Sequence, residues 1–244
     1  MNQKRAQVTI FVIIAIIIVA GIVGFFLLQN KTSILNQAVP TSIQPVYTYI
    51  DSCFKDSFEE SLFLVGLQGG YTTAPSNSLK TNLSSVAYSF SGNQITLISK
   101  QNLKKEIEDY LDLKIRNCLN NTPLDASYEI TYSKISSSVK IEDTKTTASL
   151  SAPLTIKKGE TAYSLDKDYK KEQKIRLGEL YSITEEITKQ LSNDSSSMDL
   201  TYLTSLDYEV NIIDYGNQQF LYTLSDNSSL LGGQPYLWEF AVKI

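Results

Sequence analysis

Apolar positions are most concentrated near the start of the chain. Residues 8–28 read VTIFVIIAIIIVAGIVGFFLL, a run with no charge and with Thr9 as its one polar side chain. A helix of this length is about 30 Å long, which matches the hydrocarbon thickness of a bilayer. A cleaved secretory signal has a shorter apolar core of about 7–15 residues, so the pattern favours an anchor that is retained. We therefore expect a transmembrane helix over residues 7–29.

The charges around this run predict its orientation. Lys4 and Arg5 precede it, and the first acidic residue is Asp51. By the positive-inside rule, residues 1–6 stay in the cytoplasm and the chain from residue 30 onward is extracellular. The expected location is thus the cell membrane, as a single-pass protein with the lipid bilayer as a partner. Ala20 and Gly24 form a small-xxx-small pair, which either brings two membrane helices together or arises by chance in such a span.

After the run, helical periodicity alternates with polar segments. Residues 30–43 are mostly polar and contain Pro40, which predicts a tether. Apolar residues three and four apart then predict helices over 45–68, 103–119 and 177–191. Gly69 and Gly70 end the first of these helices, and residues 71–83 are expected to form a loop.

The remaining apolar positions alternate with a period of two, which is typical of strands. Strands are predicted at 128–132 and 148–152, hairpins at 86–97, 154–164 and 206–224, and a last strand at 236–244. Its alternation places Trp238 and Phe240 on one face, in the core. The predicted class is α+β: an N-terminal transmembrane helix, then an antiparallel sheet packed with about three helices. The extracellular domain spans 44–244, with 44–120 and 121–244 as candidate subdomains.

Two cysteines fall on the apolar faces of the first two predicted helices. Outside the cell, Cys53 and Cys118 are expected to form a disulfide, and the alternative is a pair of buried thiols. The bond would close a loop of 65 residues and stabilise the domain by about 4 kcal/mol in the chain-entropy model.

Composition removes many kinds of catalytic site. The chain has no histidine, which excludes Ser-His-Asp and Cys-His catalysis and His-ligated zinc or haem. Two cysteines are too few for Cys₄ zinc or iron–sulfur sites. Ser52-x-x-Lys55 and Ser225-Asp226-Asn227 resemble two motifs of serine β-lactamases, but the third motif, Lys-Thr-Gly, is absent. We expect no catalytic activity, no cofactor and no metal.

The charge balance bears on the partners. Without Lys4 and Arg5, 20 of the 22 basic residues remain against 26 acidic ones, so the rest of the chain carries a net charge of −6. An acidic domain without a basic run argues against nucleic acid as a partner. Other envelope proteins or a second copy of the chain are the expected protein partners.

Five Asn-x-Ser/Thr sequences are candidate N-glycosylation sites in an exported domain, where about three would arise by chance. They begin at Asn30, Asn82, Asn120, Asn193 and Asn227.

The residues just before the apolar run carry a resemblance to a known family. Lys4-Arg5-Ala6-Gln7-Val8-Thr9 resembles the class III, type IV pilin-like signal of archaeal surface proteins. The resemblance implies cleavage by a prepilin peptidase between Ala6 and Gln7. Many members of that family carry a glutamate at the fifth position after the cut, where this chain has Phe11.

The layout also resembles that of uncharacterised archaeal membrane-anchored proteins with this kind of signal. The first hypothesis is therefore a membrane-anchored extracellular protein with a binding or envelope-structural role. The alternative is a type IV pilin-like subunit of a surface filament. A filament core favours one long helix that continues past the bilayer, and Pro40 would interrupt it.

Overall fold

The computed structural model describes residues 39–194 and 199–244, of which residues 41–244 form a compact unit. The predicted transmembrane helix over 7–29, the cleavage site at Ala6 and Gln7, and the Ala20–Gly24 pair lie outside the described residues, as does Asn30. Within the described ranges, no helix is long and apolar enough to cross a membrane.

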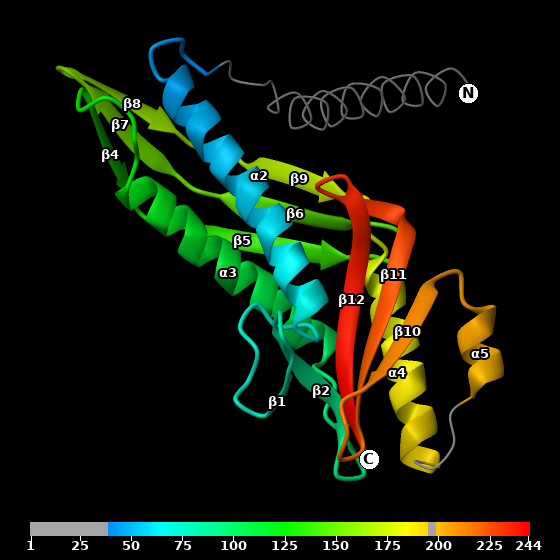
Figure 1. Cartoon of the computed structure of the whole chain (residues 1–244). Helices are drawn as coiled ribbons and strands as arrows, with labels where there is room; N and C mark the ends of the chain where they lie inside the picture. Colours follow the sequence, from blue (N-terminus) through cyan, green and yellow to red (C-terminus); the bar gives the residue numbers. More distant parts are fainter. Residues whose placement is uncertain (1–38, 195–198) are drawn as a thin grey trace, which may run out of the picture. The chain divides into compact units, whose positions relative to one another are not determined.

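The class is α+β, as predicted (Figure 1). The described helices are α2 (Gln44–Leu67), α3 (Lys100–Asn120), α4 (Leu177–Asn193) and α5 (Leu200–Ser205). The first three confirm the helices expected from periodicity, with bounds that differ by no more than three residues. The short helix α5 was not predicted; its N-cap is Asp199, whose carboxylate accepts a hydrogen bond of 2.9 Å from the backbone N–H of Tyr202.

The strands form three sheets. The first has the order β1-β2-β12-β11-β10 with β3 beside β2; the second is β4-β7-β8, and the third is β5-β6-β9. The bounds are β1 (Ser78–Lys80), β2 (Ser85–Ser91), β3 (Gln94–Ile95), β4 (Tyr128–Tyr132), β5 (Ser136–Ile141), β6 (Thr146–Ser151), β7 (Leu154–Lys158), β8 (Thr161–Leu165), β9 (Tyr169–Gln173), β10 (Glu209–Asp214), β11 (Gln219–Leu231) and β12 (Gln234–Lys243).

This arrangement corrects the expected single antiparallel sheet. β12 pairs with β11 in antiparallel orientation but with β2 in parallel orientation, through Ala241 opposite Tyr88 and Lys243 opposite Ser91. The period of two in each strand indicates which face is buried, but it does not specify the direction of a partner so far away in the chain. β1 also lies inside the segment 71–83 that was expected to be a loop.

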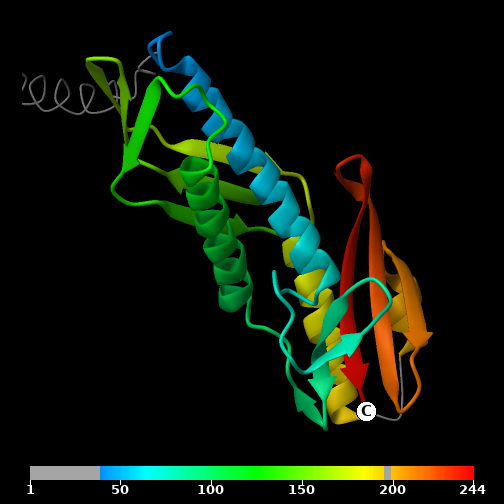
Figure 2. The same cartoon turned by 60° about the vertical axis from the view of Figure 1, so that its left-hand side comes forward.

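Helix α2 connects two parts of the domain, as both views show (Figures 1 and 2). Its buried stripe includes Ile50, Phe54 and Phe58, spaced one turn apart. Along this stripe it packs against α3 and β9, and toward its C-terminal end it packs against β12.

Helix α4 lies against the six-stranded sheet. Trp238 of β12 is completely buried and donates a hydrogen bond of 2.8 Å from Nε1 to the hydroxyl of Thr184 on α4. Phe240 and Val242, on the same face of β12, are also completely buried. The prediction that the last strand belongs to the core is confirmed.

Strands β1 and β2 extend this sheet past β12, and their side chains add to a second buried cluster. Leu79 and Val86 from the hairpin form a buried cluster with Tyr88, with Leu221 of β11 and with Ala241 of β12. This cluster lies beside Ala241, near the C-terminal end of β12, whereas the candidate site lies near the start of that strand, around Pro235 to Leu237.

Candidate functional site

An apolar groove of about 400 Å³ lies between the C-terminal half of α2 and the hairpin formed by β11 and β12. Its apolar lining consists of Phe63, Leu67, Leu231, Pro235, Tyr236 and Leu237. Ser225 and Gln234 add two polar side chains, and all of the described lining residues are uncharged. A concave apolar surface of this size is typical of a binding site for an apolar group.

A glycine sets the width of the groove. At Gly66, an added Cβ atom would lie 2.4 Å from the carbonyl oxygen of Leu237, so α2 contacts the β12 backbone directly. The hydroxyl of Tyr236 donates a hydrogen bond of 2.8 Å to the carbonyl of Leu62 and fixes this contact. Phe63 therefore stands at the edge of the groove, where 53% of its surface remains exposed.

One acidic residue lies on the same strand face, two residues beyond the groove. Glu239 follows Leu237 at the period of two, and it is partly buried. Burial raises the pKa of its carboxyl group, although a hydrogen bond of 3.4 Å from the Thr223 hydroxyl acts in the opposite direction. The groove thus combines apolar walls with one carboxyl group nearby.

A buried ion pair shapes the hairpin that forms one wall. Asp226 is completely buried and accepts hydrogen bonds of 2.9 and 2.6 Å from Nε and Nη2 of Arg176. It also accepts backbone hydrogen bonds from Ser228 and Ser229, at the position where the pairing of β11 with β12 shifts register. Within the Ser225-Asp226-Asn227 motif, Asp226 therefore holds this irregular part of the hairpin.

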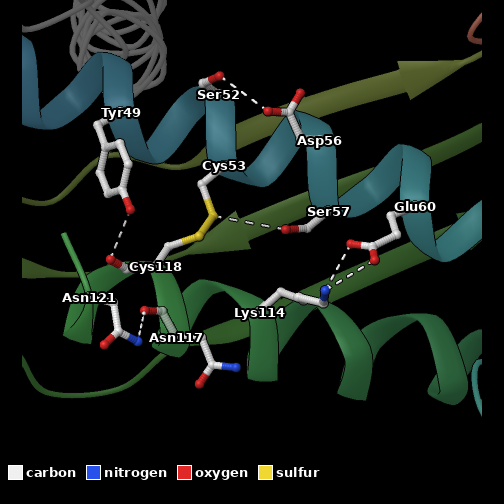
Figure 3. The surroundings of a disulfide bond; sticks show 10 residues. All are labelled: Tyr49, Ser52, Cys53, Asp56, Ser57, Glu60, Lys114, Asn117, Cys118 and Asn121. Carbon is white, nitrogen blue, oxygen red and sulfur yellow. Dashed lines mark hydrogen bonds and ion pairs between the residues drawn. A yellow bond between two sulfur atoms is a disulfide. The ribbon is translucent and has the colours of Figure 1, made fainter. Parts of the chain in front are cut away.

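The predicted disulfide between Cys53 and Cys118 is confirmed, and it joins α2 to α3 with a Cα–Cα distance of 6.7 Å (Figure 3). The hydroxyl of Ser57 lies 3.9 Å from Sγ of Cys53. The hydroxyl of Tyr49 donates a hydrogen bond of 3.1 Å to the carbonyl of Cys118, which adds a second link between the two helices.

A polar hollow of about 330 Å³ lies beside the disulfide and includes Ser52 in its lining. Two of its lining residues, Lys114 on α3 and Glu60 on α2, form an ion pair with 2.9 Å between Nζ and the carboxylate (Figure 3). Ser52 donates a hydrogen bond of 3.4 Å to Asp56, and Lys55 pairs with Glu59 at 3.9 Å. Ser52 therefore lines this hollow, whereas Ser225 of the other motif lines the apolar groove.

The candidate glycosylation sites within the described residues are all exposed: Asn82, Asn120, Asn193 and Asn227. Asn120 accepts a hydrogen bond of 3.0 Å from the hydroxyl of Tyr132. Ser229, the hydroxyl residue of the Asn227 sequence, is 1% exposed. Glycosylation at these positions stays a prediction. Among residues 39–194 and 199–244, no group of three or more Cys, Asp or Glu side chains is placed to hold a metal ion.

Sequence reasoning missed the apolar groove, although α2 carries a signal for it. Residues 62–67 read LFLVGL, so the last turns of the helix are apolar on all sides and not on one stripe. An apolar residue off the buried stripe, such as Phe63, indicates a second surface in contact with another group. The other wall could not be predicted, because it depends on how far α2 lies from β12.

A comparison with protein family models, with curated proteins and with solved structures finds no match to this chain.

Proposed function

We propose that this chain is a single-pass membrane protein whose extracellular domain binds another envelope component and has no catalytic activity. The disulfide between Cys53 and Cys118 carries this proposal. Disulfides form and persist mainly outside the cytoplasm, which agrees with the export of the domain expected from Lys4 and Arg5. The uncharged apolar groove supports a binding role, because its lining offers shape and apolar surface without an acid or a base.

Protease treatment of intact cells tests the location. Added protease should remove the domain of residues 44–244 from intact cells, while a cytoplasmic marker protein stays intact. A domain that resists protease on intact cells, but is digested after the membrane is opened with detergent, would place it inside and would overturn the proposal.

A second candidate function is a type IV pilin-like subunit of a surface filament, which the sequence of residues 4–9 favours. In this case the mature chain begins at Gln7. Mass spectrometry of the N-terminal peptide from the native membrane should then find residues 1–6 removed, and electron microscopy should find filaments that contain the chain. A mature chain that keeps Lys4 and Arg5 would exclude this processing.

A further inference from the structure

The apolar groove leaves hydrophobic surface in contact with water. Phe63 is 53% exposed and Leu237 is 37% exposed, and Leu230 on the adjoining hairpin is 56% exposed. Exposed apolar side chains grouped around a hollow are a common mark of an interaction site. The occupant of the groove should therefore present an apolar side chain from a projecting segment.

The chain itself contains such a segment. Leu83, in the turn between β1 and β2, is 97% exposed. The hydroxyl of Thr81 holds this turn, because it accepts hydrogen bonds from the backbone N–H groups of Leu83 and Ser84 at 3.2 and 3.0 Å. Thr81 also donates its backbone N–H to the carbonyl of Ser84 at 3.0 Å. A rigid turn loses little conformational freedom when it binds, which favours its use as a contact.

The charges of the two surfaces are complementary. Between residues 76 and 85 the one charged side chain is Lys80, a cation, and Leu83 is flanked by the uncharged Asn82 and Ser84. The groove face carries the carboxyl group of Glu239 beyond Leu237. By contrast, Leu113, which is 55% exposed on α3, stands between the charged residues Asp112 and Lys114.

We propose that the β1–β2 turn of a second copy of this chain docks in the apolar groove, with Leu83 seated beside Phe63 and Leu237 and with Lys80 facing Glu239. The proposal rests on the binding role proposed above and names the partner. A contact between two different surfaces of the same chain closes into a symmetric pair or ring, or extends into a fibre, according to the rotation between copies.

Cross-linking between two copies of the full-length chain in the membrane tests this contact. One tagged copy carries Leu83→Cys and a differently tagged copy carries Leu231→Cys, while the native cysteines remain in their disulfide. Brief oxidation should yield more product with both tags than the same experiment with Leu113→Cys in place of Leu83→Cys, because docking of the turn brings position 83, and not position 113, beside position 231 of the other copy. Equal yields from the two experiments would overturn the proposal.

Variants on each surface sharpen the test. Phe63→Ser in the Leu231→Cys copy should lower the yield about tenfold. Asn193→Gln removes a glycosylation sequence outside the turn and the groove, so it should leave the yield unchanged. Lys80→Glu should lower the yield and Glu239→Lys in the other copy should restore it; no effect of Lys80→Glu would overturn the charge pairing. The intact Cys53–Cys118 disulfide and a cooperative thermal unfolding transition report that each variant is folded.

The outcomes separate this proposal from the proposed function. If the Leu231→Cys copy cross-links to a different envelope protein in preference to a second copy, the proposal that a second copy occupies the groove is overturned. The proposed binding role then stands. If the domain is protected from protease on intact cells, the proposed extracellular function is overturned, whatever the cross-link shows.

Discussion

Arg176 connects three segments of the domain through its guanidinium group. Besides the two hydrogen bonds to Asp226, it donates one of 3.1 Å to the carboxylate of Asp207. The guanidinium carbon also lies 4.4 Å from the ring centre of Tyr208. Burial by itself would raise the pKa of Asp226, but the hydrogen bonds from Arg176 and Ser229 outweigh it and lower that pKa. The Asp226 carboxylate therefore stays ionised in the interior, and the hydrogen bonds from Arg176 stabilise its charge.

The first prediction concerns Arg176→Met, which removes the charge but keeps much of the packing. The change should lower the free energy of unfolding by about 3–5 kcal/mol, because it leaves Asp226 buried without a partner. Chemical denaturation of the domain at pH 7 measures this loss. Arg116→Met is the matched control: Arg116 pairs with Asp112 at 3.9 Å on the surface, so its loss should cost less than about 1 kcal/mol. Equal losses of unfolding free energy in the two variants would show that the buried pair contributes no more to stability than the surface pair.

The second prediction concerns Glu239, whose pKa is raised by burial. The folded state therefore binds its proton more tightly than the unfolded state does. The stability that this group contributes is fully present below the unfolded pKa, about 4.3 for glutamate, and is lost as the pH rises through the folded pKa. Glu239→Gln imitates the neutral form, so it should make the domain more stable than wild type at pH 7 and similar to wild type near pH 3.5.

Chemical denaturation of both proteins across this pH range provides the measurement for Glu239. Glu209→Gln is the control, since Glu209 is exposed on the edge strand β10. A stability difference between Glu239→Gln and wild type that stays constant with pH would contradict the prediction.

At the scale of elements, the contact between α2 and β12 depends on the missing side chain at Gly66. The helix has an apolar C-terminal end, and Gly66 allows that end to lie against the β12 backbone at Leu237. A longer separation would leave Tyr236 without its hydrogen bond to α2 and would widen the groove. The position of α2 thus controls both the packing of β12 and the shape of the apolar groove.

The third prediction concerns Gly66→Ala, for which helix propensity and steric contact with β12 change the free energy of unfolding in opposite directions. Helix propensity by itself would make alanine stabilising by roughly 0.5–1 kcal/mol. The added Cβ would lie 2.4 Å from a backbone oxygen, so we expect a net destabilisation of about 1–3 kcal/mol instead. Thermal unfolding measures it, with Ser52→Ala on the exposed face of α2 as a control that should change little. A stabilised Gly66→Ala protein would show that α2 can move away from β12 at low cost.

At the scale of the whole domain, the six-stranded sheet depends on β12, which lies between β11 and β2. The fourth prediction is that deletion of residues 236–244 abolishes cooperative thermal unfolding of the domain. The deletion removes Trp238 and Phe240, whose burial contributes several kcal/mol out of a typical total of about 5–15 kcal/mol. A cooperative transition at an unchanged temperature in the chain of residues 39–235, compared with 39–244, would show that β12 is peripheral.

The sequence was most informative where periodicity was strong. The three long helices, the hairpin about Gly216 and the buried face of β12 could all be predicted, because each shows a clear period in its apolar residues. β5 was missed because it reads SSSVKI, with one strongly apolar buried residue, Val139, and it is held by its pairing with β6. The parallel pairing of β2 with β12 and the apolar groove depend on contacts between distant segments, which local patterns do not encode.

The same parallel pairing has a consequence for the time at which the domain can fold. Ser89 of β2 donates a hydrogen bond of 3.2 Å to the carbonyl of Ala241, a residue that is synthesised 152 positions later. At about 5–20 residues per second, β2 waits roughly 8–30 s for this partner. During that interval a strand with a largely buried sequence, SVAYSFS, exposes an unpaired edge, which is a risk for aggregation. The export that we propose would therefore have to hold the early part of the domain unfolded or shielded until β12 has been delivered to the same side of the membrane.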